Sequence, residues 1–295
     1  MYELRNVLKD AQNNGVGIGH FNVSDWVLLK AVFASAREVK VPVVVGVSEG
    51  ERAFLGTAQI AALVKSLREE HDFPVFLNAD HTHSLESAIA AVKAGFDSIV
   101  FDLSALPFDE NIRQTKQAIE AVKSINPAIL MEGGIGDIGT GSEIHEQAPD
   151  RAKILTTAEE AKHFVERTGV DILAPAVGNM HGMLQVMLQG DVRKRLDLAR
   201  IQEIKSACQC FLTLHGGSGT ADSDLQGAIA AGINIIHINT ELRVAWRQSL
   251  EQAFAQKPHE VVPYKLLPAA EQAVAQVVQA RLRLFTQQRK QPTVQ

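Results

Sequence analysis

Three histidines of this chain each follow a short apolar run, where a strand would meet a loop. They are His81, His181 and His215, and the residue before His81 is a carboxylate, Asp80. If the apolar runs are neighbouring parallel strands, the three imidazoles converge at one end of one sheet. Three imidazole ligands that leave a fourth position open are typical of a catalytic zinc site. The sequence therefore predicts a divalent ion of the zinc type on these side chains, acting as a Lewis acid on a carbonyl.

A single histidine in such a place is more often a packing residue, so the metal interpretation depends on the three together. Apart from His237, in the last apolar run, the other histidines lack this placement, and we expect surface or packing roles for them. They are His20, His71, His83, His145, His163 and His259.

Three carboxylates also stand at the ends of apolar runs. Asp80 is placed to remove or return a proton beside a carbonyl polarised by the metal ion, although on its own it would be read as a strand-end cap. Asp102 and Glu132 end the next two runs. Carboxylates there can hold ligating imidazoles in one tautomer, and solvated strand ends are the alternative for both residues.

A glycine-rich segment, Gly216-Gly217-Ser218-Gly219, precedes a helical pattern that begins near Asp222. Its amides and the helix dipole can cradle a phosphate group. Asn239 and Thr240 follow the last apolar run, and the loops after the seventh and eighth strands are the usual phosphate position of barrel enzymes. A tight turn without a ligand is the alternative.

Eight apolar, β-branched runs alternate with amphipathic segments along the chain. The expected strands are 16–23, 41–47, 74–80, 98–102, 128–132, 172–177, 211–215 and 233–238. The expected helices are 25–39, 57–70, 84–94, 109–124, 157–168, 198–207, 222–231, 241–255 and 269–288. Continuous hydrophobicity is typical of strands buried on both faces of a parallel sheet. Strict alternation predicts an α/β fold, a (β/α)₈ TIM barrel with extra C-terminal helices, over an open doubly wound sheet.

No linker or repeat interrupts this pattern. We therefore expect one domain over residues 1–288 and a polar tail over 289–295. The longest irregular stretch is 133–156, and a segment of that length inside a compact domain predicts a functional lid or a mobile loop.

Composition excludes several classes of protein. The chain has 295 residues, of which 46% are hydrophobic, and its net charge is −5, so a polyanionic partner such as nucleic acid is not expected. Cys208 and Cys210 are too close for a structural disulfide, which favours a reducing compartment. No segment resembles a signal peptide or a membrane span. We therefore expect a cytoplasmic protein without a membrane partner.

Together these motifs resemble class II, metal-dependent ketose-bisphosphate aldolases, in the branch of the fructose- and tagatose-bisphosphate aldolases. The resemblance covers almost the whole chain. It runs through Gly19-His-Phe-Asn22-Val, Val47-Ser48-Glu49-Gly50, Asp80-His81, residues 101–111, Thr168-Gly-Val-Asp171, His181-Gly182, His215-Gly-Gly-Ser-Gly219 and Asn239-Thr240-Glu241-Leu242.

The resemblance implies reversible cleavage of a ketose such as fructose- or tagatose-1,6-bisphosphate into dihydroxyacetone phosphate and an aldehyde. One Zn²⁺ per subunit would be held by the three histidines, and Asp80 would shuttle the proton of the aldehyde-derived hydroxyl. Further residues would bind substrate and phosphate, some of them with a monovalent cation, Na⁺ or K⁺. These residues are Asn22, Ser48, Gly182, Gly216, Gly217, Ser218, Asn239 and Thr240.

The resemblance also implies a glutamate on the loop after the fifth strand that takes a proton from the triose. Glu143 and Glu146 both match this role, and spacing does not decide between them. In the family an arginine of the C-terminal helix reaches the substrate phosphate of a neighbouring subunit, and Arg281 is the nearest match. A homodimer or homotetramer is therefore expected.

Two positions depart from the family pattern. Gly134 stands where the family usually has glutamate, and His237 stands where it usually has asparagine. His237 either replaces the hydrogen bond of the asparagine or offers the metal ion another imidazole. The departures keep two alternatives open, namely an aldolase of the same fold with a different keto substrate, and a catalytically impaired metal-binding barrel that serves as a partner subunit.

Overall fold

The computed structural model describes residues 2–136, 138–139, 141–146, 155–190 and 192–287. Eight parallel strands close into a barrel in the order β1-β10-β9-β7-β5-β4-β3-β2. The strands are β1 (Ile18–Asn22), β2 (Val43–Val47), β3 (Val75–Thr82), β4 (Ser98–Phe101), β5 (Leu130–Ile135), β7 (Ile172–Pro175), β9 (Phe211–Leu214) and β10 (Ile233–Ile238). The predicted (β/α)₈ barrel is confirmed, and its eight strands are the eight predicted apolar runs with shifted ends.

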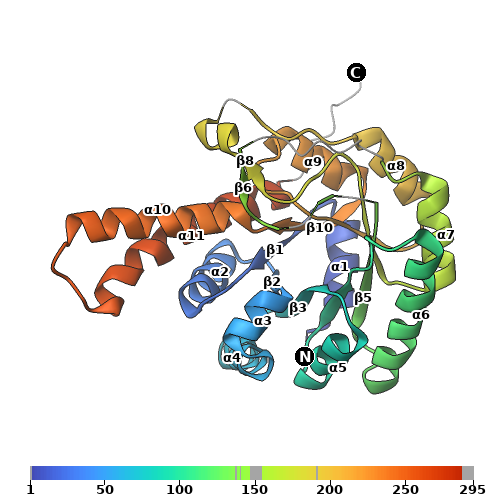
Figure 1. Ribbon diagram of the computed structural model, residues 1–295, viewed down its shortest axis with the longest axis horizontal. Helices are drawn as coiled ribbons and strands as arrows, with labels where there is room; N and C mark the ends of the chain where they lie inside the picture. Colours follow the sequence, from blue (N-terminus) through green and yellow to red (C-terminus); the bar gives the residue numbers. More distant parts are fainter. Residues whose placement is uncertain (1, 137, 140, 147–154, 191, 288–295) are drawn as a thin grey trace.

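Helices surround the barrel, as Figure 1 shows. They are α1 (Leu4–Asn13), α2 (Trp26–Val39), α3 (Glu49–Leu55), α4 (Thr57–His71), α5 (Leu85–Ala94), α6 (Phe108–Ile125), α7 (Ala158–Thr168), α8 (Leu198–Ala207), α9 (Asp222–Ala231), α10 (Thr240–Gln256) and α11 (Pro263–Thr286). Among the described residues, none of them is long and apolar enough to cross a lipid bilayer.

The strands are buried on both faces because the helices cover the outside and side chains fill the inside. Every residue of β1, β2, β4 and β5 is buried. The amino-terminal end of the barrel is closed by α1, which was not among the predicted helices. Its Leu4 and Leu8 pack against Phe76 and Leu130 near the starts of β3 and β5. The opposite end, at the carboxyl ends of the strands, is left for polar side chains.

The third strand continues two residues beyond its predicted end. Its pairing with β4 shifts register between Ala79 and Thr82. At the shift, His81 adopts a φ of 41°, a left-handed conformation that is rare outside glycine and strained by about 1–3 kcal/mol. The irregularity turns His81 out of the regular alternation of the strand.

The two C-terminal helices, α10 and α11, run antiparallel, and their joined end projects beyond the barrel (Figure 1). The second helix begins at Pro263, before its predicted start at 269, and continues through Pro268. Burial of Leu266 and Ala270 on either side of Pro268 explains why tertiary packing outweighs the proline there. The predicted end at 288 and the predicted tail over 289–295 lie outside the described residues.

A two-stranded parallel ribbon lies outside the barrel. It pairs β6 (Ile144–His145) with β8 (Met183–Leu184), and a 3₁₀ helix, η1 (Gln185–Gln189), follows it. This ribbon joins part of the loop after β5 to the segment that follows His181. Cys208 and Cys210 are free thiols.

Candidate metal centre and active site

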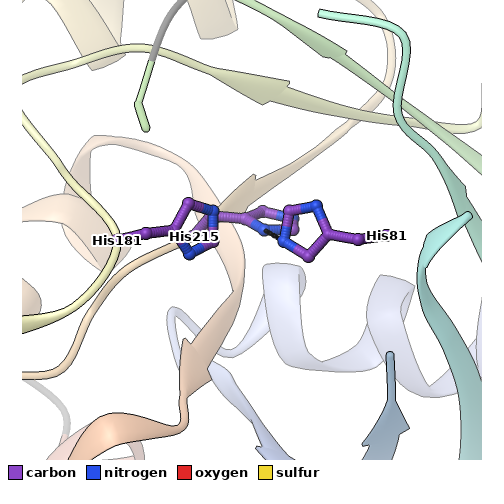
Figure 2. A group of neighbouring side chains, drawn as sticks. All are labelled: His81, His181 and His215. Atoms are coloured by element: carbon purple, nitrogen blue, oxygen red, sulfur yellow. Dashed lines mark hydrogen bonds between the residues drawn. The ribbon is translucent and has the colours of Figure 1, made fainter. Parts of the chain in front are cut away.

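The three predicted metal ligands come together at the carboxyl ends of the strands. His81 lies in β3, His181 lies in the loop after β7, and His215 directly follows β9. One ring nitrogen from each lies within 4.8 Å of the other two. Figure 2 shows the three rings directed toward one another, with His81 approaching from the side opposite His181.

Two carboxylates decide which nitrogens face the centre. His81 Nδ1 donates to Asp102 Oδ2 at 2.7 Å, and His215 Nε2 donates to Glu132 Oε1 at 2.7 Å. His81 Nε2 and His215 Nδ1 are therefore left on the inner side, 3.3 Å apart. In the described part of the chain, His181 Nε2 is buried without a hydrogen-bond partner. A trio of inward-facing nitrogens, with carboxylates behind two of the rings, fits a divalent transition ion.

A buried arginine supports the irregular end of β3. Arg52 Nη1 donates to the carbonyl oxygens of Val47 at 2.6 Å and Asp80 at 3.1 Å, and Arg52 Nη2 donates to Thr82 Oγ1 at 3.0 Å. These bonds flank His81 on both sides and hold its strained backbone in place. No spacing pattern in the sequence indicated a role for Arg52.

Asp80 presents one free carboxylate oxygen to the centre. Its Oδ2 accepts a hydrogen bond from Asn22 Nδ2 at 2.9 Å, whereas its buried Oδ1 has no partner among the described residues. Oδ1 lies 3.8 Å from His81 Nε2 and 3.6 Å from His237 Nδ1. Burial raises the pKa of Asp80, but His81 and His20 outweigh it and hold the pKa below its usual range. Asp80 is therefore an ionised carboxylate that can accept a proton at Oδ1.

His237 stands in a column of imidazoles inside the barrel. Its ring stacks on His20 at a centroid distance of 3.4 Å and an angle of 4°, and on His215 at 4.0 Å and 30°. Burial lowers the pKa of His20 and of His237, so both rings are neutral. His20 was expected at the surface or in packing; it is buried and packs beside the centre.

The second group of candidate ligands, His20, Asp80 and His237, has a less suitable geometry for a metal ion. An imidazole binds a metal ion in the plane of its ring, and parallel rings 3.4 Å apart cannot both direct a lone pair at one ion. The stacking on His20 therefore argues against His237 and His20 holding one ion together. The role of His237 stays a prediction.

A small cavity adjoins Asp80 and His181 on the side of β10. It is lined by Asn22, Asp80, Ser142, His181, Gly182, Gly216, Ser218, His237, Asn239 and Thr240. Helix α10 begins at Thr240, which lines the cavity where the sequence placed a phosphate, so the positive end of the helix dipole lies there. Its first amides are already used within the chain, since Glu241 N donates to Ser218 Oγ at 3.4 Å and Leu242 N donates to the Asn239 carbonyl at 2.9 Å. Asn239 Oδ1 is buried there without a partner among the described residues.

Not every predicted phosphate ligand is free. Gly217 N donates to the His237 carbonyl at 3.0 Å, and Gly219 N donates to Glu241 Oε1 at 2.8 Å. Ser218 Oγ accepts from Asn239 N at 3.1 Å. The Gly217 and Gly219 amides are thus used within the chain.

A second cavity opens beside the first toward the surface. It is lined by Ser48, Asp80, His81, His83, Asp102, Gly139, Gly141, Ser142, His181, Asn239 and Arg243. Arg243 Nη2 donates to Glu51 Oε1 at 2.8 Å at the mouth of this cavity. Sequence reasoning missed Arg243, which brings a cation to the site from α10.

Three predicted residues lie away from the centre in this chain. The side chains of Glu143 and Glu146 are exposed, and neither lines the two cavities. Arg281 pairs with Glu241 and with Asp222 of its own chain. The roles of these residues stay predictions.

Gly134 leaves space where the family usually has a glutamate side chain. A Cβ at this position would lie 3.4 Å from Asp102 Oδ1. The space belongs to a third small cavity, lined also by His81 and His215. The departure therefore removes a side chain from the immediate surroundings of the candidate ligands.

Fold and site together define a class of barrel enzymes in which histidines at the strand ends can hold a divalent ion. The model of the family described as "Fructose-bisphosphate aldolase class-II" matches residues 2–290, and the chain belongs to this family. It is an aldehyde-lyase, which cleaves a carbon–carbon bond of a phosphorylated ketose. The family is metal-dependent and acts on sugar phosphates.

Similar proteins span the whole chain. A fructose-bisphosphate aldolase of Thermus caldophilus is 32% identical over 95% of this chain and 96% of its own length. A sulfofructosephosphate aldolase of Alkalicoccus urumqiensis is 31% identical over 98% of both chains. The crystal structure of the YdjI aldolase from Escherichia coli K12 matches with a TM-score of 0.78 and 29% identity, over 96% of both chains. Relatives at similar identity thus carry names that specify different substrates.

Proposed function

We propose that the chain is a zinc-dependent aldolase that cleaves a ketose phosphate, of the fructose- or tagatose-1,6-bisphosphate kind, into dihydroxyacetone phosphate and an aldehyde. The observation that carries the proposal is the convergence of three inward-facing imidazole nitrogens beside the unpartnered Asp80 Oδ1. His81, His181 and His215 would hold one Zn²⁺ per subunit. When bound, the ion would supply Lewis-acid polarisation of the substrate carbonyl.

The side chains around the ion would handle the proton. Asp80 Oδ1 would accept the proton of the substrate hydroxyl as the carbon–carbon bond breaks, and would return it in the condensation direction. Asn22 holds the other oxygen of the same carboxylate, so it would fix the direction of Oδ1. Asp102 and Glu132 would keep the imidazoles of His81 and His215 in the tautomers that leave their inner nitrogens unprotonated.

The phosphate of the triose would bind at the N-terminus of α10. Gly182, Gly216 and Ser218 line the adjoining cavity, together with Asn239 and Thr240. The positive end of a helix dipole attracts an anion. Ser48 lines the outer cavity, where the rest of the substrate would lie. Glu143 or Glu146 would return a proton to the triose carbon.

We also propose a single domain over residues 1–288 that assembles as a homodimer or homotetramer. The joined end of α10 and α11 supports the assembly, because it exposes Phe254, Val261 and Tyr264, which are 53%, 85% and 76% accessible. Large apolar side chains gathered on a projecting pair of helices are typical of an interface. Arg281, from α11, would reach the substrate phosphate of the neighbour. The cytoplasmic location stays a prediction.

The first test removes the metal ion. Dialysis against a chelator is expected to abolish cleavage of fructose- and tagatose-1,6-bisphosphate, and Zn²⁺ is expected to restore it. His215→Ala should lose bound zinc and cleavage together, whereas His163→Ala, at an exposed histidine of α7, should keep both. Borohydride with substrate should trap no lysine adduct. Full cleavage by protein that elemental analysis shows to be metal-free would refute the proposal.

A second candidate keeps the metal ion and changes the substrate. Gly134 and His237 favour it, because both lie beside the candidate ligands and both depart from the family pattern. Dihydroxyacetone phosphate, dihydroxyacetone and pyruvate should each be offered as donor with a panel of aldehydes. Condensation with dihydroxyacetone phosphate alone supports the first candidate, and condensation with either other donor supports the second. Absence of proton exchange on all three donors would favour a barrel that has lost catalysis.

A further inference from the structure

A lysine is buried directly behind the candidate active site. Lys194 lies between η1 and α8 and is 5% accessible. Its backbone is fixed to the loop after β9, because Lys194 N donates to the Gly219 carbonyl at 2.9 Å and Ala221 N donates to the Lys194 carbonyl at 3.2 Å. The side chain therefore starts from a rigid point and reaches inward.

The amino group of Lys194 ends in a cage of three backbone carbonyl oxygens. Nζ donates to Met180 O at 2.8 Å, to Gly182 O at 2.5 Å and to Gly216 O at 3.0 Å. Three acceptors match the three N–H groups of an ammonium ion, one more than a neutral amine can offer. No carboxylate of the described residues forms an ion pair with Lys194. The hydrogen bonds of Nζ are thus to backbone carbonyl dipoles. Burial lowers the pKa of Lys194 to about 7, against the opposing effect of Glu241.

The cage exists because two glycines adopt left-handed backbones. Gly182 has a φ of 72° and Gly216 a φ of 61°. A Cβ on Gly216 would lie 2.2 Å from the Met180 carbonyl oxygen, which excludes any other residue there. The glycines thus allow the loops after β7 and β9 to approach until their carbonyl oxygens share one point. Converging backbone carbonyls are also the ligands that proteins use for K⁺.

We propose that the ammonium group of Lys194 serves as a built-in monovalent cation, in the place where the family resemblance implies a free Na⁺ or K⁺. Met180 and Gly182 flank His181, and Gly216 follows His215, so one charge ties together two loops that carry candidate metal ligands. Gly182 and Gly216 also line the cavity at the start of α10. Lys194 is therefore a positioning residue that fixes these loops and adds a positive charge behind the phosphate region.

With this cage already filled, the wild-type protein should be indifferent to monovalent metal ions. Its thermal unfolding temperature should be the same in KCl and in choline chloride at equal ionic strength. Lys194→Ala empties the cage and should unfold at a lower temperature in choline chloride, with K⁺ or Tl⁺ restoring part of the loss. A crystal of this variant soaked in Tl⁺ should show one anomalous peak among the three carbonyl oxygens.

Two further variants make the test specific. Lys194→Met fills the same space without a charge, so no monovalent ion should restore its stability. Lys205→Ala removes another partly buried lysine, whose Nζ donates to the Cys210 carbonyl at 2.8 Å, and it should not create any dependence on K⁺. If Lys194→Ala fails to fold, the wild-type comparison still decides, because stabilisation of the wild type by K⁺ over choline would overturn the inference. Lys194→Ala without bound Tl⁺ would overturn it as well.

The consequence for catalysis rests on the proposed function, whereas the ion-binding measurements do not. In choline chloride, Lys194→Ala should lose about tenfold or more in kcat/KM for the ketose phosphate, the scale of a buried hydrogen bond to a charged group. KCl should restore most of that loss in Lys194→Ala and leave the wild type unchanged. If neither protein cleaves any ketose phosphate, the proposed function fails while the Tl⁺ and unfolding results still decide the role of Lys194.

Discussion

Replacing Asp102 by asparagine should weaken zinc binding through the tautomer of His81. Asp102 Oδ1 accepts from Ser104 N at 3.0 Å and from Ser104 Oγ at 2.7 Å, while Oδ2 accepts from His81 Nδ1 at 2.7 Å. A backbone N–H can only donate, so the amide oxygen of the introduced asparagine must stay on Ser104. The amide NH₂ then faces His81 and requires an acceptor at Nδ1. The imidazole proton moves to Nε2, the nitrogen that faces the centre.

The expected loss of zinc affinity follows from what a carboxylate contributes when it accepts a hydrogen bond from a metal-binding histidine. Losing such a partner costs about 10- to 100-fold in metal affinity, or about 1.4 to 2.7 kcal/mol. The loss of zinc affinity in Asp102→Asn should be about 100-fold or more, because this change also imposes the wrong tautomer on His81. Glu132→Gln is the matched control, since Thr213 Oγ1, 3.0 Å from Glu132 Oε2, can accept as well as donate. The introduced glutamine can keep its oxygen on His215, so the loss of zinc affinity in Glu132→Gln should be about tenfold.

The assay is a zinc titration of metal-free protein in competition with a chromophoric chelator. Circular dichroism should first show that both variants are folded like the wild type. The expected order of affinity is wild type, then Glu132→Gln, then Asp102→Asn. Equal losses in the two variants, or wild-type affinity in Asp102→Asn, would refute the tautomer argument.

Two further predictions concern the same centre. Asp80→Asn should keep its zinc and lose about 10²-fold or more in kcat for cleavage, the scale of a general acid–base residue; an unchanged kcat would remove Asp80 from the proton transfer. Burial lowers the pKa of His81, but Asp80 and Asp102 outweigh it and raise the pKa from 6.5 to about 9. In the metal-free protein, protonated His81 therefore stabilises the folded state, fully below pH 6.5. As the pH rises through 9, the free energy of unfolding should fall by about 3 kcal/mol, which urea unfolding at a series of pH values would measure. Asp102→Asn should flatten that profile, and an equally steep profile in the variant would contradict the cause given.

The barrel was predictable because its signal is local and repeated. Each strand is a continuous apolar run, and each run is followed by an amphipathic segment, so eight independent patterns indicate the same fold. The convergence of His81, His181 and His215 was predictable for a related reason, since the carboxyl ends of parallel strands meet at one face. The residues needed only to be found at the ends of the runs.

Other features of the site depend on contacts between distant parts of the chain. The stack of His20 on His237 joins the first strand to the last, and no pattern around either residue indicates it. The left-handed turn at His81 depends on hydrogen bonds from Arg52, a residue of another element. The cage of Lys194 is made of backbone carbonyls, which no side-chain pattern reports. Helix α1 was missed although the sequence carries its signal, since the buried Leu4, Leu8 and Ala11 recur at helical spacing.

The β6–β8 ribbon links the loop after β5 to the segment that carries His181. Ile144 pairs with Met183, Met183 N donates to the Glu143 carbonyl at 2.9 Å, and His181 N donates to the Ile138 carbonyl at 2.9 Å. Displacing the loop therefore also displaces the imidazole of one candidate metal ligand, His181. Thermodynamic reciprocity then requires that a cation bound at the three imidazoles favours the docked loop, and that docking of the loop strengthens retention of the cation. Substitutions in this ribbon, although none of its residues ligates, are consequently expected to change how long the ion stays bound.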